Sequence, residues 1–110
     1  MLQVIRDHIV KAPKRSPRWP WAKRIYKRAV IRKHGALICE ACGRKKWIIF
    51  IHHILPFHLW PGKELDQNNL IALCAWCHLT LGHLRNWRSW NEKVREQAAL
   101  LLKQIKERPF

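Results

Sequence analysis

Two matched pairs of cysteines constrain this chain more than any other feature of its sequence. Cys39 and Cys42 are separated by two residues, and Cys74 and Cys77 repeat that spacing. Thiolates at this spacing turn toward one ion, and four of them complete a tetrahedral zinc site with no open position. The first ten residues are too charged for the apolar centre of a secretory signal, which argues against disulfides. We therefore expect a structural Zn²⁺ that stabilises a core too small to be stable alone.

The chain is strongly basic, and the basic residues are unevenly distributed. Its 110 residues include 22 Lys and Arg against 7 Asp and Glu, for a formal charge of +15. Residues 1–36 hold 11 of these basic side chains and one acid, whereas residues 37–86 hold five basic and three acidic side chains. A hydrophobic fraction of 48% argues against disorder, and no apolar run approaches the roughly 18–20 residues that span a bilayer. This balance indicates a polyanionic partner, with nucleic acid ahead of an anionic membrane surface.

We expect one domain made of three segments. Residues 1–36 are predicted to form a basic arm over 1–14 and then a helix, which opens near Pro17 or Pro20, ends at Gly35 and has Trp21, Ile25 and Ala29 on one apolar face. Residues 37–86 form the core. Residues 87–110 form a C-terminal helix capped by Asn91, and its apolar stripe consists of Val94, Ala98, Leu101, Leu102 and Ile105. Of the seven tryptophans, only Trp19 and Trp21 are expected to contact a nucleic acid, and the others to pack in the core or beside the zinc.

The 31 residues between the cysteine pairs carry the unusual chemistry. Trp47–Ile51 is rich in β-formers and predicts a strand that leads into His52 and His53. Neighbouring side chains on a strand face opposite ways, so these two histidines are expected to serve different tasks. A second strand is predicted at Leu70–Leu73, and a helix that opens with His78 follows Cys77.

These elements resemble the HNH endonucleases, whose core is the ββα-metal motif. The residues that carry the resemblance are His52-His53-Ile54, then Asn69-Leu70, then Leu73-Cys74-x-x-Cys77-His78. Pro56-Phe57-His58, Glu64-Leu65-Asp66 and Gly82-His83-Leu84 are similar to segments of small phage-type members. The resemblance spans residues 15–109. It implies an α+β fold with a small zinc-stapled ββα-metal (His-Me finger) core and flanking N- and C-terminal helices.

The resemblance also implies a role for each histidine of the motif. His53 is the general base, Asn69 holds the hairpin and the base in place, and His52 and His78 are ligands of one catalytic divalent ion. His83 is a third ligand, a phosphate contact or a packing residue, and the sequence leaves these three roles open. His58 either orients substrate or is structural. The ion is Mg²⁺, Mn²⁺, Ni²⁺, Co²⁺ or Zn²⁺; the neutral His52, where many members have an acid, favours the last four.

The implied function is metal-dependent hydrolysis of DNA by a one-metal mechanism, giving 5′-phosphate and 3′-hydroxyl ends. The alternative is a zinc-finger DNA-binding protein without catalysis. Phage packaging proteins are further expected partners, no membrane is expected, and the implied location is the cytoplasm of a bacterial host. The basic side chains expected to contact DNA phosphates are Arg15, Arg18, Lys23, Arg24, Lys27 and Arg28.

Overall fold

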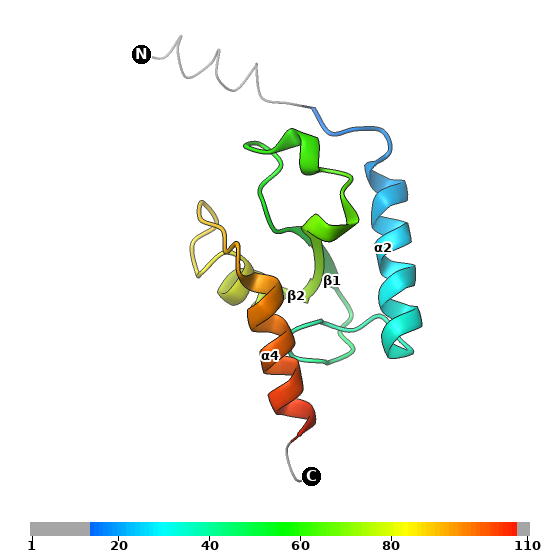
Figure 1. Cartoon of the computed structure of the whole chain (residues 1–110), viewed down its shortest axis with the longest axis vertical. Coiled ribbons are helices and arrows are strands. Elements are labelled where there is room, and N and C mark those ends of the chain that lie inside the picture. Colours follow the sequence, from blue (N-terminus) through cyan, green and yellow to red (C-terminus); the bar gives the residue numbers. More distant parts are fainter. Residues whose placement is uncertain (1–13, 108–110) are drawn as a thin grey trace.

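The structure, a computed structural model, describes residues 14–107, so the basic arm predicted over residues 1–14 lies outside it except for Lys14. A two-stranded antiparallel sheet lies between two long helices, which confirms the expected α+β class (Figure 1). In chain order the elements are α2 (Trp19–His34), β1 (Ile49–His53), η1 (Pro61–Lys63), η2 (Gln67–Asn69), β2 (Leu70–Cys74), α3 (Ala75–Cys77), η3 (His78–Gly82) and α4 (Val94–Lys106).

The register of the hairpin corrects the predicted first strand. Ile49 lies opposite Cys74 and His53 lies opposite Leu70, so β1 begins two residues later than expected and includes both histidines. The second strand turns toward the cysteine cluster after Cys74 and offers no partner beyond Ile49. Trp47 and Ile48 consequently precede the strand and are exposed, although both residue types favour β-structure.

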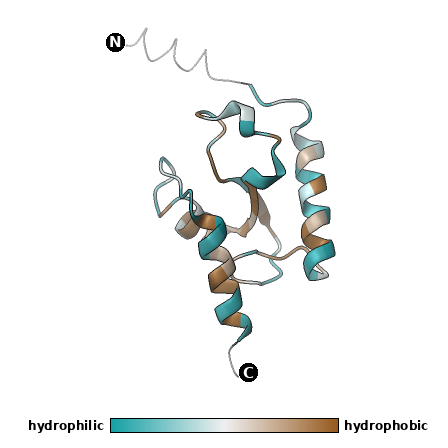
Figure 2. Cartoon of the chain, viewed as in Figure 1, coloured by the Kyte–Doolittle hydropathy of each residue, from teal (hydrophilic) through white to brown (hydrophobic). Residues whose placement is uncertain are grey.

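Side chains of β2 alternate between two small cores. Ile71 and Leu73 pack with the cysteines and with α4, whereas Leu70 and Ala72 pack with α2. All five residues of this strand are buried, because each of its faces is covered by a different helix. The colouring of Figure 2 shows the hydrophobic residues concentrated on the strands and on parts of both helices.

Helix α2 buries a different face from the one predicted. Pro20 lies in its first turn and Gly35 ends it with a φ of 81°, as expected. The buried residues, however, are Ala22, Tyr26 and Val30, and Trp21 is 60% exposed. The helix is rotated by one residue because Tyr26, rather than Ile25, reaches inward to a polar partner.

That partner is Glu40, which joins α2, the first cysteine pair and β2. The Tyr26 hydroxyl donates to the Glu40 carboxylate. The same carboxylate accepts from the Ala72 amide at 2.9 Å, and the Glu40 amide donates to the Ala72 carbonyl at 2.8 Å. Burial and the neighbouring Glu40 raise the pKa of Tyr26, so its hydroxyl stays protonated and remains a donor.

Helix α4 packs beside η3 and over the first cysteine pair. Val94 and Ala98 are buried in the core that contains the cysteines. Asn91 lies three residues before the helix; its side chain accepts from the Lys93 amide and donates to the Leu81 carbonyl. Gly43 adopts a φ of 77°, which strains any other residue, and a Cβ there would lie 2.8 Å from the Leu102 Cδ1, so the Leu102 side chain would have to move.

The four cysteines converge as predicted. Their sulfur atoms all lie within 4.8 Å of one another, and the Sγ atoms of Cys42 and Cys74 are 3.9 Å apart. Sulfurs bound to one tetrahedral zinc ion are about 3.8 Å apart, so this cluster fits the ion. Burial raises the pKa of the Cys42 and Cys77 thiols, and a bound cation is what would keep them deprotonated.

Replacement of Cys77 by serine is expected to abolish binding of one zinc equivalent and with it cooperative thermal unfolding, since the core is small and the metal contributes folding free energy. Elemental analysis and circular dichroism measure the two effects. A zinc-free chain that melts at the wild-type temperature would show that the cluster does not need metal.

Candidate functional site

A cavity of about 540 Å³ lies beside β1 and is lined by the histidines, and by half of the basic side chains, that the sequence analysis selected. All five residues of β1 line it, together with one face of α2 and the segment Trp87–Ser89. His52, His53, His78 and His83 all reach its wall. The structure therefore brings the histidines of the motif to one cavity.

The π-helical turn η3 decides where His83 lies. In an ordinary helix His83, five residues after His78, would be out of line with it. Here the His83 amide donates to the His78 carbonyl at 3.1 Å, the five-residue hydrogen bond of a π-helix. The two Nε2 atoms consequently lie 3.2 Å apart, and His83 joins the other histidines of the motif.

Three imidazole nitrogens converge as metal ligands would. The His78 Nε2 lies 3.1 Å from the His52 Nδ1 and 3.2 Å from the His83 Nε2, and ligand nitrogens of all three rings lie within 4.8 Å. Nitrogens on one tetrahedral zinc ion are about 3.3 Å apart. His83 donates from Nδ1 to the Ser89 carbonyl at 2.8 Å, so in the neutral ring its Nε2 carries a lone pair.

The protonation states of these histidines also favour a metal site. A neutral His78 has one N–H and cannot donate from Nε2 to both neighbours at once. Burial, and then the charges of the other two rings, lower the pKa of His52 to about 3. Burial and then His83 lower the pKa of His78 to about 4. The rings of His52 and His78 are therefore neutral at pH 7, the form that binds a divalent ion.

Gly82 allows the His52 ring to lie where it does. Gly82 is buried in η3, and a Cβ at this position would be 3.2 Å from the His52 Nε2. That nitrogen is buried and has no hydrogen-bond partner among the described residues. The close approach of the η3 backbone is therefore what holds this ring toward His78 and His83.

His53 faces the α2 side of the hairpin, as the alternation along the strand predicts. Its ring stacks on Trp19 with centroids 4.4 Å apart. Its Nε2 donates to the Glu64 carbonyl at 3.0 Å, which leaves Nδ1 with the lone pair. The Arg15 guanidinium donates toward that lone pair at 3.4 Å. Burial lowers the pKa of His53; the hydrogen bond to the Glu64 carbonyl opposes this and the charge of Arg15 adds to it, and the net lowering keeps the ring neutral at pH 7.

Glu64 is a site residue that the sequence reasoning singled out only as part of a family-like segment. Its side chain is buried and accepts from the Ser16 amide at 3.0 and 3.2 Å. Its carbonyl holds His53 at the same time. Glu64 thus fixes the segment that carries Arg15 against the base. Its place in that segment, Glu64-Leu65-Asp66, was the signal for it in the sequence.

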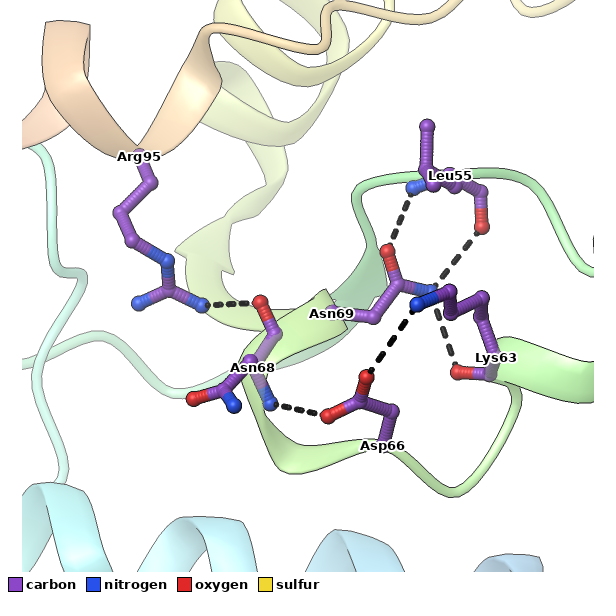
Figure 3. A network of polar contacts seen from close by, with 6 residues as sticks. All are labelled: Leu55, Lys63, Asp66, Asn68, Asn69 and Arg95. Atoms are coloured by element: carbon purple, nitrogen blue, oxygen red, sulfur yellow. Dashed lines mark hydrogen bonds and ion pairs between the residues drawn. The ribbon is translucent and has the colours of Figure 1, made fainter.

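Asn69, and not Asn68, is the centre of the loop between the strands (Figure 3). The Asn69 side chain is buried; it accepts from the Leu55 amide at 2.8 Å and donates to the carbonyls of Leu55 and Lys63, each at 3.2 Å. Asn68 is exposed and makes backbone contacts with Asp66 and Arg95. The hydrogen bonds of Asn69 close the loop that places Glu64 beside His53.

The six basic residues predicted to contact DNA divide into two groups. Arg15, Lys23 and Lys27 line the cavity, because positions 19, 23 and 27 share one face of α2. Arg18, Arg24 and Arg28 are exposed outside it. His58 is exposed at the cavity rim. The sequence reasoning did not assign Phe50, Trp87 or Arg88 to the site, yet all three line the cavity.

Comparisons with known proteins agree with this geometry. Residues 39–84 match the family described as HNH endonuclease, a range that contains both cysteine pairs and all five histidines that line the cavity. The match confirms the family resemblance over this range, which is shorter than the 15–109 expected. Neither a search of curated proteins nor one of solved structures found a match. Within residues 14–107 no helix is long and apolar enough to cross a membrane.

A Gly82→Ala substitution is expected to weaken binding of a second divalent ion, beyond the structural zinc, by about tenfold, because the added methyl displaces His52. Titration calorimetry with Ni²⁺ on zinc-loaded protein measures the change. Gly62→Ala is the matched control, since a Cβ there contacts nothing within 4 Å. Equal affinities in the two variants would contradict a positioning role for Gly82.

Proposed function

On the premise that residues 39–84 belong to the HNH endonucleases, we propose that the chain is a metal-dependent DNA endonuclease that hydrolyses phosphodiester bonds. The observation that carries the proposal is the cavity itself. A neutral His53, whose Nδ1 lone pair faces Arg15, lines the same cavity as three converging imidazoles, and Lys23, Lys27 and Arg88 line it as well.

His53 acts as the general base. Its Nδ1 takes a proton from the attacking water, while the hydrogen bond from Nε2 to the Glu64 carbonyl holds the tautomer and stabilises the imidazolium that results. The ring cannot turn away, because it is stacked on Trp19. Asn69 supports the base indirectly by closing the loop that carries Glu64.

His52, His78 and His83 would hold the divalent ion. A bound ion supplies Lewis-acid stabilisation of negative charge on the phosphate and on the leaving 3′-oxygen. A zinc ion held by the four cysteines would have no open position and would be structural. Three neutral nitrogen ligands suit Mn²⁺, Co²⁺, Ni²⁺ or Zn²⁺ better than Mg²⁺, which prefers oxygen.

Basic side chains on the wall place the DNA. Arg15 lies against the base and, on binding, exchanges that contact for the phosphate to be cut. Lys23 and Lys27 continue along α2 and contact neighbouring phosphates without reading sequence. The products carry 5′-phosphate and 3′-hydroxyl ends. Phage packaging partners and a location in the bacterial cytoplasm stay predictions from the resemblance.

The substitution His53→Ala is expected to lower plasmid nicking at least about 100-fold, because it removes the base, and EDTA is expected to stop nicking by the wild-type chain. His58→Ala is the control, since His58 lines the same cavity but lies at its exposed rim. If His53→Ala binds DNA, keeps its zinc and nicks at the wild-type rate, a non-catalytic DNA-binding protein explains the site better.

Metal dependence gives a separate test. Nicking by protein that retains only its structural zinc is expected to be restored by Mn²⁺, Co²⁺, Ni²⁺ or additional Zn²⁺ at lower concentrations than by Mg²⁺. Initial rates measured over a titration of each ion decide the order. Support by Mg²⁺ alone would contradict the three-histidine ligand set.

A further inference from the structure

Two exposed aromatic side chains flank the histidine cluster. The Phe50 ring stacks on His78 with centroids 5.0 Å apart. The Trp87 ring lies 5.3 Å from His78 and 4.9 Å from His83. Phe50 is 40% exposed and Trp87 is 61% exposed, so both present ring surface to solvent at the wall of the cavity. This uncovered ring surface beside the proposed metal ligands is open to a partner in the cavity.

The charge of the cavity indicates what that partner is. Arg15, Lys23, Lys27 and Arg88 line the wall, and no acidic side chain of the described residues does. Arg88 directly follows Trp87, so a cation and an exposed ring adjoin on one segment. Cations that track a backbone, combined with aromatic faces on which bases stack, are how proteins bind single-stranded nucleic acid.

A regular duplex cannot use these rings. In B-form DNA each base face is covered by its stacked neighbours, and only the base edges are open in the grooves. Aromatic rings within about 5 Å of the metal ligands would meet the nucleotides next to the cut phosphate. They can stack on those bases only where the bases are already unstacked.

We propose that Phe50 and Trp87 bind the faces of unstacked bases beside the phosphate at His53, and that DNA with unpaired nucleotides at this point is the preferred substrate. The inference rests on the proposed nuclease function. It concerns the form of DNA that the cavity accepts, and this can be measured without cleavage.

The test measures DNA binding by a zinc-loaded His53→Ala chain, in which cleavage does not interfere. Fluorescence anisotropy compares a labelled single strand with the duplex of the same sequence. Phe50→Leu and Trp87→Leu keep an apolar side chain and remove the ring, and Trp87→Phe keeps a ring. Trp76→Leu is the matched control, because Trp76 is 62% exposed and does not line the cavity.

Each leucine variant is expected to raise the Kd for the single strand by roughly tenfold and to change the Kd for the duplex much less. Trp87→Phe is expected to recover most of the affinity, and Trp76→Leu to match the parent chain. Equal losses on both DNA forms, or the same loss in Trp76→Leu, would overturn the proposal.

Because Phe50 contacts one proposed ligand and Trp87 contacts two, Ni²⁺ binding by each variant is measured in parallel. If Trp87→Leu binds Ni²⁺ less well, its loss of single-strand affinity could come from the metal site. Phe50→Leu and Trp87→Phe then decide whether the aromatic ring itself binds the bases. Cleavage is a separate outcome. If the parent chain prefers the single strand but the chain with His53 restored does not cut DNA, the binding proposal stands and the nuclease proposal fails.

Discussion

The four-cysteine cluster is the constraint on which the other elements depend. It ties the turn before β1 to the end of β2, two segments separated by 31 residues. Cys74 ends the second strand and thereby sets the register that starts β1 at Ile49. Cys77 directly precedes η3, so the same cluster holds the turn that carries His78 and His83. A small core could not hold these segments without it.

Two adjacent residues on one short strand supply both parts of the proposed chemistry. His52 faces the cysteine side, where η3 presents two further imidazoles, and His53 faces α2, where Trp19 and Glu64 hold it. Because successive side chains on a strand point to opposite faces, the proposed base and the proposed ligand are adjacent in the chain but have different neighbours. Asn69 closes the loop that carries Glu64. The Glu64 carbonyl then accepts from His53, and the Glu64 carboxylate accepts from the amide of Ser16, which precedes α2.

Spacing and residue type predicted the features that depend on local chemistry. The cysteine pairs, the second strand, the opposite orientation of His52 and His53 and the end of α2 at Gly35 are all present. The start of β1 and the buried face of α2 were predicted wrongly. Each was decided by a partner far away in the sequence: Cys74 for the strand, and Glu40 for the helix through Tyr26. Trp87, expected to be packing, lies at the cavity wall with most of its ring exposed.

The sequence by itself determined that this chain has a four-cysteine cluster, a pair of neighbouring histidines that face opposite sides of one strand and a large positive charge. Only the tertiary structure decided that His83 joins the cluster, because the π-turn moves its ring by one position and spacing alone cannot reveal such a turn. It also decided which basic side chains face the histidines and which aromatic rings stay exposed beside them. The rotation of α2 decides the first, and the path of residues 83–89 contributes to the second. Packing between segments distant in the sequence fixes both the rotation and the path.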